Sequence, residues 1–128
     1  RRCDTQRNLD EQGRNQARKL GKLLKNSGIS FDQVYSSQWC RCLETAELLN
    51  LGPVIEEPGL NSFFQRIVSQ EETLSRLREK MKEIQTAGER VIMVTHYVTI
   101  SAITGKAVSS GGGVVYDIDS GKSVEIDF

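Results

Sequence analysis

At residues 36–46 the chain reads SSQWCRCLETA, a passage in which a strand pattern gives way to a helix pattern. It begins at the end of a predicted strand, Gln33 to Ser36, and continues into a predicted helix, Trp39 to Leu49. Arg41 therefore lies at a junction between a strand and a helix. Because α/β proteins bind ligands at the carboxyl ends of their parallel strands, we expect Arg41 to face a ligand.

A second strand leads to His96, the only histidine of the sequence. Residues 91–96 read VIMVTH, and a helix from Val98 to Ile103 can begin directly behind them. If both strands belong to one parallel sheet, Arg41 and His96 converge on one anion, and we predict that this anion is a phosphoryl group. Taken alone, each residue has an ordinary explanation as a surface arginine or a structural histidine.

The remaining segments alternate between helical and strand patterns. Apolar spacing predicts helices at residues 10–26, with Asp10 as the cap, and at residues 69–86, where Ser69 and Glu72 form a capping box. Short strands are predicted at residues 54–56, 114–118 and 123–126, and residues 59–66 are predicted to form an ordered loop. We therefore expect one domain over residues 1–128, an α/β three-layer sandwich with a mainly parallel sheet between helices and a C-terminal hairpin.

Composition limits the classes of protein to consider. The 128 residues are 38% hydrophobic and 27% charged, which suits one compact domain with a single core. The 17 basic and 17 acidic residues balance, so the overall charge gives no reason to expect nucleic acid or an anionic membrane as a partner. The longest apolar run, Val91 to Val94, is far shorter than the ~20 residues that cross a bilayer. We expect a soluble protein whose attraction for phosphate is local.

Three blocks of the chain, taken in order, resemble the histidine phosphatase superfamily, which has the phosphoglycerate mutase-like fold. The first block is TQRNLDEQG at residues 5–13, the second is the Ser-Ser, arginine and Thr-Ala pattern within residues 36–46, and the third is Thr95-His96. Each block alone is weak, but three blocks on the expected elements are more specific. The pattern of tryptophan, cysteine, arginine and cysteine at residues 39–42 is similar to that of exported bacterial members.

The resemblance implies roles for three side chains. Arg41, near the start of a helix, is expected to bind phosphate bidentately, and Arg7 is expected to be the other phosphate-binding arginine. His96 is expected to donate to the phosphoryl oxygens and to stabilise the transition state. The resemblance implies no metal and no organic cofactor.

The sequence departs from the family at the first strand. Relatives begin with a strand that delivers an arginine-histidine pair, whose histidine is the nucleophile, and His96 does not match that pair. We expect that a strand upstream of Arg1 belongs to the intact domain, because without it the sheet would expose unpaired edges. Alternatively, a second copy of the chain supplies a strand at that place in the sheet, in a homodimer formed by strand exchange.

A second departure concerns the general acid. Many relatives carry a glutamate after a leucine near the middle of the chain, whereas this sequence has Asn61 after Leu60. An amide cannot donate a proton as a carboxylic acid does, so we expect Asn61 to orient the substrate. Asp4 and Glu44 are alternative acids, although both also fit ordinary exposed positions.

Three cysteines, Cys3, Cys40 and Cys42, permit either a metal site or a disulfide. With His96 they reach a zinc-like ligand count, but Cys40 and Cys42 would point about 200° apart around a helix, which disfavours zinc. If the two phosphate-binding arginines share a phosphate, Cys3 approaches the second helix and can pair with Cys40 or Cys42. Such a disulfide predicts a periplasmic or secreted protein, with a cytoplasmic protein as the alternative.

These features predict a phosphatase-type hydrolase that works through a phosphohistidine intermediate in the intact protein. The expected substrate is a small phosphomonoester or a phosphoprotein side chain, because a short chain leaves little room for an elaborate specificity pocket. Mutase activity is less expected, since it needs a pocket that reorients a bisphosphate. The opposing hypothesis is a catalytically silent domain that binds phosphate or a partner.

Overall fold

The structure is a computed structural model that describes residues 3, 9–61, 70–106, 113–116 and 120–126. Helices and strands alternate along the chain, as predicted. The elements are α1 (Glu11–Asn26), β1 (Gln33–Ser36), α2 (Cys40–Leu49), β2 (Val54–Glu56), the 3-10 helix η2 (Pro58–Leu60), α3 (Gln70–Ala87), β3 (Val91–Val94), α4 (Tyr97–Thr104), β4 (Gly113–Tyr116) and β5 (Ser123–Ile126).

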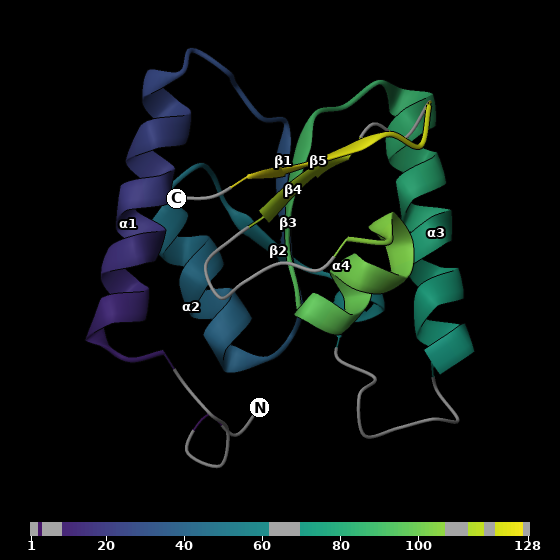
Figure 1. Cartoon of the computed structure of the whole chain (residues 1–128), viewed down its shortest axis with the longest axis horizontal. Coiled ribbons are helices and arrows are strands. Elements are labelled where there is room, and N and C mark those ends of the chain that lie inside the picture. Colours follow the sequence, from purple (N-terminus) through teal and green to yellow (C-terminus); the bar gives the residue numbers. More distant parts are fainter. Residues whose placement is uncertain (1–2, 4–8, 62–69, 107–112, 117–119, 127–128) are drawn as a thin grey trace.

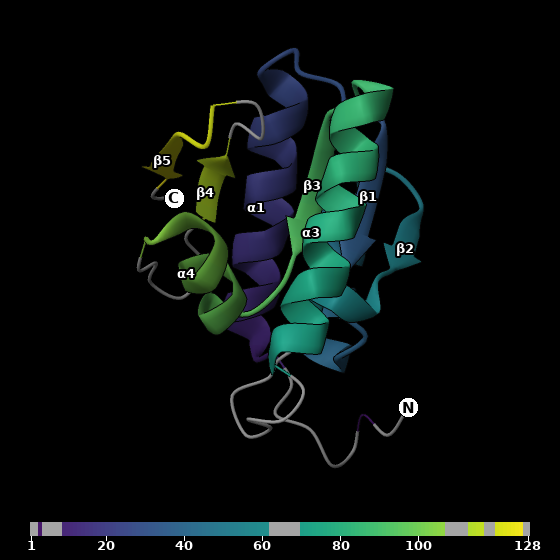
Figure 2. The same ribbon diagram turned by 90° about the vertical axis from the view of Figure 1, so that its right-hand side faces the viewer.

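The strand β1 is the centre of a parallel sheet with the order β2-β1-β3. Ser36, at the end of β1, pairs with Glu56 of β2 and with Val94 of β3. The carboxyl ends of β1 and β3 therefore lie at the same edge of the sheet (Figure 2). The segments that carry Arg41 and His96 start side by side from this edge.

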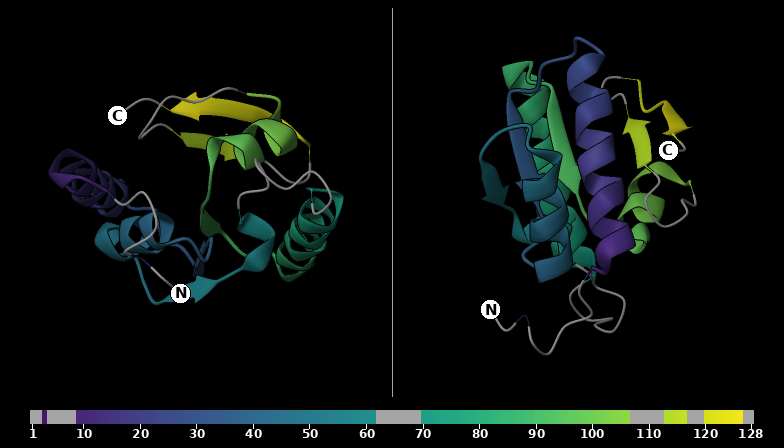
Figure 3. Two further views of the ribbon diagram at one scale, coloured as in Figure 1. Left: turned by 90° about the horizontal axis from the view of Figure 1, so that it is seen from below. Right: turned by 90° about the vertical axis from the view of Figure 1, so that its left-hand side faces the viewer.

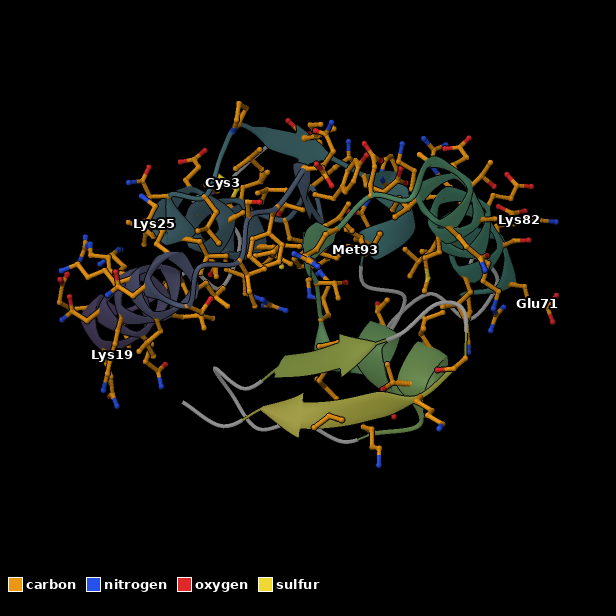
Figure 4. The ribbon with its side chains drawn as sticks, turned by 90° about the horizontal axis from the view of Figure 1, so that it is seen from above. Cys3, Lys19, Lys25, Glu71, Lys82 and Met93 are labelled. Atoms are coloured by element: carbon orange, nitrogen blue, oxygen red, sulfur yellow. A yellow bond between two sulfur atoms is a disulfide. The ribbon has the colours of Figure 1, made fainter. Side chains whose placement is uncertain are left out.

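Helices cover both faces of the sheet, so the predicted α/β sandwich is confirmed. Figure 1 shows α1 and α2 on one side of the strands and α3 on the other, and Figure 3 shows the same arrangement from below. On the α3 face, Tyr35 is buried in a cluster with Leu60, Leu77 and Ile84. In Figure 4, Met93 of β3 lies between the helices on the two sides of the sheet, whereas the labelled charged side chains of α1 and α3 point outward.

The helix α1 begins at its predicted cap and packs closely against α2. The carboxylate of Asp10 accepts a hydrogen bond from the amide of Gly13 at 2.8 Å. Farther along α1, a Cβ atom at Gly21 would stand 2.1 Å from the carbonyl oxygen of Leu49, the last residue of α2. The two backbones can approach this closely because Gly21 has no side chain.

The C-terminal hairpin forms as predicted, and it is a sheet of its own. The strands β4 and β5 pair antiparallel, with Gly113 opposite Ile126 and Tyr116 opposite Ser123. In Figure 3 the hairpin lies beside α4 and away from β2. Within the described residues, β3 pairs only with β1, and all four β3 residues are half-buried. One flank of β3 is therefore partly uncovered there.

The boundaries of the elements differ from the predicted ones by about a residue at most helix ends. The expected capping residue Ser69 precedes α3 and lies outside the described residues. The 3-10 helix η2 (Pro58–Leu60) overlaps the start of the predicted loop at residues 59–66, and residues 62–66 of that loop lie outside the described residues. None of the described helices is long and apolar enough to cross a membrane.

Candidate active site

Arg41 and His96 meet at the carboxyl edge of the parallel sheet. Arg41 lies in the first turn of α2, behind β1, and His96 is the N-cap residue of α4, behind β3. The Nη2 atom of Arg41 is 3.0 Å from the Nδ1 atom of His96. The two residues are far apart in sequence, and they meet because β1 and β3 are neighbours that end in register.

The site combines a cation with a neutral ring. His96 is only 5% exposed, and burial, followed by the charge of Arg41, lowers the pKa of the imidazole to about 4. Arg41 also lies over the ring of Trp39, 5.6 Å from its centroid. No carboxylate of the described residues forms an ion pair with Arg41. Among those residues, no acidic side chain neutralises the charge of Arg41.

The N-termini of α2 and α4 both lie at this pair. Trp39 caps α2 and His96 caps α4, and neither side chain makes a capping hydrogen bond. The positive ends of two helix dipoles therefore reinforce the charge of Arg41. An anion with several oxygen atoms is the kind of ligand that this arrangement favours.

Ser37 is a site residue for which the sequence suggested no individual role. Its side chain is completely buried, and Oγ lies 3.0 Å from Nε2 of His96. The same hydroxyl donates to Oδ1 of Asn61 at 3.1 Å and accepts from the backbone amide of Trp39 at 3.2 Å. The Ser-Ser block was the available signal, but only the structure shows which atoms this serine contacts.

Asn61 reaches the site because η2 is anchored from two directions. The hydroxyl of Thr95, the residue that follows β3, donates to the carbonyl oxygen of Leu60 at 2.5 Å. The buried carboxylate of Glu57 accepts from Nε of Arg76 on α3 at 3.0 Å. These contacts hold the chain so that the Asn61 side chain lies against Ser37. Asn61 is thereby connected to His96 through two hydrogen bonds, with the Ser37 hydroxyl between them.

The remaining candidates from the sequence are the alternative general acids, Glu44 and Asp4, and the second phosphate-binding arginine, Arg7. The Glu44 carboxylate accepts from Nε of Arg14 at 3.1 Å, and this pairing raises the pKa of the Arg14 guanidinium. Glu44 is thus engaged with α1 rather than with His96. Arg7 and Asp4 fall outside the described residues.

The cysteines form one disulfide, between Cys3 and Cys40, and leave Cys42 as a buried free thiol. The zinc alternative is wrong, because two of its expected ligands are bonded to each other. The disulfide attaches the N-terminal segment to α2 one residue before Arg41. Burial raises the pKa of the Cys42 thiol to about 11, and its Sγ atom lies 3.7 Å from Nε2 of His96.

The arginine and the histidine lie at the carboxyl edge of a parallel sheet, which is the usual position of the ligand site in an α/β fold. The model of the histidine phosphatase superfamily (branch 1) matches residues 1–67, and the chain belongs to this superfamily. No curated protein matches the chain in a sequence comparison.

Solved structures share the fold at low sequence identity. The protein histidine phosphatase SixA, solved with tungstate, is 15% identical with a TM-score of 0.69, over 94% of this chain and 83% of that one. A phosphoserine phosphatase mutant from Entamoeba histolytica, solved with phosphoserine, is 18% identical with a TM-score of 0.67, over 98% and 85%. The α-ribazole phosphatase from Shigella flexneri is 20% identical with a TM-score of 0.62, over 90% and 80%.

Proposed function

We propose that this protein is a phosphatase-type hydrolase of phosphomonoesters or phosphorylated protein side chains. The observation that carries the proposal is the contact between Arg41 and His96 at the N-termini of two helices. Membership in the histidine phosphatase superfamily supports the same chemistry. A half-buried guanidinium beside a buried imidazole, without a carboxylate partner among the described residues, is suited to a phosphoryl group.

In this proposal the two residues stabilise the charge of the transferring phosphoryl group. Arg41 donates two parallel hydrogen bonds to the equatorial oxygens, and His96 donates a third. Arg7 is the other phosphate-binding arginine, and Asn61 helps to orient the substrate, as expected from its place after Leu60. Fixed donors of this kind act without reorganising during the reaction, which is why their removal is costly.

The nucleophile in this proposal is a histidine on a strand upstream of Arg1, and it forms a phosphohistidine intermediate. Two observations favour an additional strand beside β3. Among the described residues β3 has a single neighbour and is half-buried throughout. The hydroxyl of Thr99, in the first turn of α4, is buried without a partner in the described part, whereas buried hydroxyls normally have one. Strand exchange in a homodimer is the alternative source of that strand.

Two considerations support the proposed substrate class. A short chain leaves little room for an elaborate specificity pocket, and structures with the same fold include phosphatases of phosphorylated side chains. SixA is a protein histidine phosphatase, and the Entamoeba histolytica enzyme was solved with phosphoserine. We propose that the substrate is either a phosphorylated side chain or a small phosphomonoester. The Cys3–Cys40 disulfide supports an oxidising compartment, so we propose a periplasmic or secreted location.

The experiment compares two forms of the protein on a generic aryl phosphate. One is the 128-residue chain, and the other is the same chain extended by its native upstream residues. We expect the extended chain to hydrolyse the ester and the shorter chain to bind inorganic phosphate without turnover. Arg41→Ala in the extended chain is expected to lower kcat/KM by about 10²–10³-fold.

The matched control is Arg18→Ala, which removes the same charge from the exposed face of α1, where Arg18 pairs with Glu11. It should leave kcat/KM unchanged. If both forms bind phosphate through Arg41 and neither turns it over, the protein is the catalytically silent domain. If neither form binds phosphate, there is no phosphate site at this edge of the sheet.

A further inference from the structure

The hydrogen bonds around His96 determine which of its nitrogens carries the proton. An arginine only donates, so Nδ1, which faces Arg41 Nη2 at 3.0 Å, must be the acceptor in the neutral ring. The proton of a neutral His96 is therefore on Nε2. That nitrogen faces inward, toward the fully buried Oγ atom of Ser37.

Ser37 can only accept from His96, because its own proton is already committed. Its hydroxyl accepts from Nε2–H of His96 and from the amide of Trp39, and it donates to Oδ1 of Asn61. A hydroxyl offers one donor and two acceptor positions, so all three are used.

The orientation of Asn61 follows from a backbone donor. The amide N–H of Gln38 lies 2.8 Å from Oδ1 of Asn61, and a backbone N–H cannot accept. This atom is therefore the oxygen, and it is held there as an acceptor for the Ser37 hydroxyl. The other end of the amide donates from Nδ2 to the side chain of Gln38 at 2.9 Å.

Other ionisable groups near His96 are few in the described part of the structure. Arg41 and Cys42 approach it from α2, and the Cys42 thiol is neutral at ordinary pH. On α4, Tyr97 follows it and is exposed. Within the described residues, the loop behind β1 and the segment after η2 contribute neutral side chains, those of Ser37, Trp39 and Asn61.

We infer that Ser37 and Asn61 are positioning residues that hold the proton on Nε2 of His96, so that His96 can donate to an anion at Arg41 only as a protonated, cationic imidazolium. The inference rests on the proposed phosphate site, which puts the anion against Arg41 and Nδ1. A neutral ring could donate from Nδ1 only if Nε2 gave up its proton and accepted from Ser37. The hydrogen bond from Ser37 to Asn61 prevents that exchange.

The consequence is that anion binding takes up one proton. In the free protein Nδ1 presents a lone pair, which would repel an oxyanion. When the anion binds, Arg41 turns to the ligand, Nδ1 gains a proton and donates, and Nε2–H stays on Ser37. The proton comes from solvent, or from the ligand if the ligand carries one.

The first test is ¹⁵N NMR of the imidazole in the 128-residue chain, where a single histidine gives one set of signals. We expect Nε2 protonated and Nδ1 bare in the free protein, and both nitrogens protonated when sulfate is bound. Asn61→Ala frees the Ser37 proton, so the sulfate complex should then show Nδ1 protonated and Nε2 bare. Gln38→Ala is the matched control, because it keeps the Gln38 backbone donor and should behave like the wild type.

The second test is the pH dependence of sulfate affinity, since sulfate stays a dianion where phosphate itself titrates. The wild-type affinity should fall about tenfold per pH unit above the pKa of the free imidazole, as one proton is taken up. Asn61→Ala should make this dependence nearly flat. Asn61→Asp keeps an oxygen acceptor and should restore the slope, which a merely structural role would not explain.

Two results would overturn the inference while leaving the proposed site intact. One is a protonated Nδ1 in the free wild-type protein, and the other is a sulfate complex in which one nitrogen of the wild-type ring stays bare. If neither sulfate nor inorganic phosphate changes the His96 signals, the anion site is wrong and the inference fails with it.

Discussion

Arg41 presents a flat, permanently charged fork beside the edge of a buried ring. The guanidinium contacts Nδ1 of His96 and lies over the indole of Trp39, so both neighbours hold it at this edge of the sheet. Charge alone would be supplied equally well by a lysine. The planar fork adds two parallel donors that match two oxygens of a phosphoryl group.

Replacing Arg41 by lysine therefore tests geometry at constant charge. We expect Arg41→Lys to weaken binding of inorganic phosphate about tenfold, which corresponds to about 1.4 kcal/mol. Isothermal titration calorimetry at fixed pH and ionic strength measures the change. The control is Arg18→Lys, at an exposed position on α1, and this variant should bind phosphate as tightly as the wild type does. Equal affinity of Arg41→Lys and the wild type would contradict bidentate binding.

His96 makes stability depend on pH in a defined window. Its pKa is about 4 in the folded protein and about 6.5 in the unfolded chain, so between these values only the unfolded chain binds the proton. The free energy of unfolding should therefore fall as the pH is lowered through this window, by at most about 1.4 kcal/mol per pH unit. Above it, this contribution is constant.

Urea unfolding over this pH range, for the wild type and for His96→Gln, isolates the contribution of the imidazole. The difference between the two proteins should shrink steadily as the pH falls, because the variant has no ring to protonate. A difference that does not change with pH would mean that His96 is not held neutral in the folded state.

At the scale of elements, α1 and α2 are joined by a backbone contact that leaves no room for a side chain. Gly21 lies against the carbonyl of Leu49, and both backbones belong to regular helices, so neither can yield locally. This contact fixes how α1 crosses α2. The N-terminus of α2, which carries Arg41, is positioned by the same pair of helices.

Gly21→Ala should lower the free energy of unfolding by about 1–3 kcal/mol, although alanine is the better helix former. Chemical denaturation followed by circular dichroism measures the loss. Gly13→Ala in the same helix is the control, because the nearest atoms there belong to the Leu9 and Asp10 side chains. The control should be neutral or slightly stabilising; similar losses at both positions would contradict the packing argument.

The elements could be predicted because local chemistry specifies them. Asp10 caps α1, and the apolar run Val91–Val94 forms β3, as their sequence patterns indicated. The meeting of Arg41 and His96 was also predictable, since parallel neighbours end at one edge. The choice of Cys40 over Cys42 as the partner of Cys3 was not, because it depends on how α2 is rotated about its axis.

The contact between Ser37 and Asn61 could not be read from the sequence for a similar reason. It requires η2 to be anchored by Thr95 and by the Glu57–Arg76 pair, and all of these are long-range interactions. The low pKa of His96 is also a property of burial, which arises only when the elements pack.

At the scale of the whole molecule, the disulfide joins the N-terminal segment to the second helix. Cys3 and Cys40 are separated by 37 residues, a loop that contains all of α1 and β1. Closing such a loop restricts the unfolded chain and thereby stabilises the folded one. The loop also ends beside Arg41, so the covalent link lies next to the proposed phosphate site.

Replacing both Cys3 and Cys40 by serine should lower the free energy of unfolding by about 3–4 kcal/mol on the loop-closure model. The wild type in reductant should show a similar loss, measured by denaturant unfolding. Thiol titration of the denatured protein without reductant should count one thiol, and with reductant three, in accord with three cysteines and one disulfide. Three thiols in both conditions would exclude the bridge.

The buried Cys42 thiol offers a way to time the opening of the site. Its pKa of about 11 and its burial beside His96 protect it from alkylating agents in the closed structure. Labelling can therefore proceed only through transient exposure of α2, at a rate set by how often that exposure occurs. Mass spectrometry of Cys42 alkylation, with and without bound anion, would report how strongly a ligand at Arg41 slows these openings, without any probe being introduced into the chain.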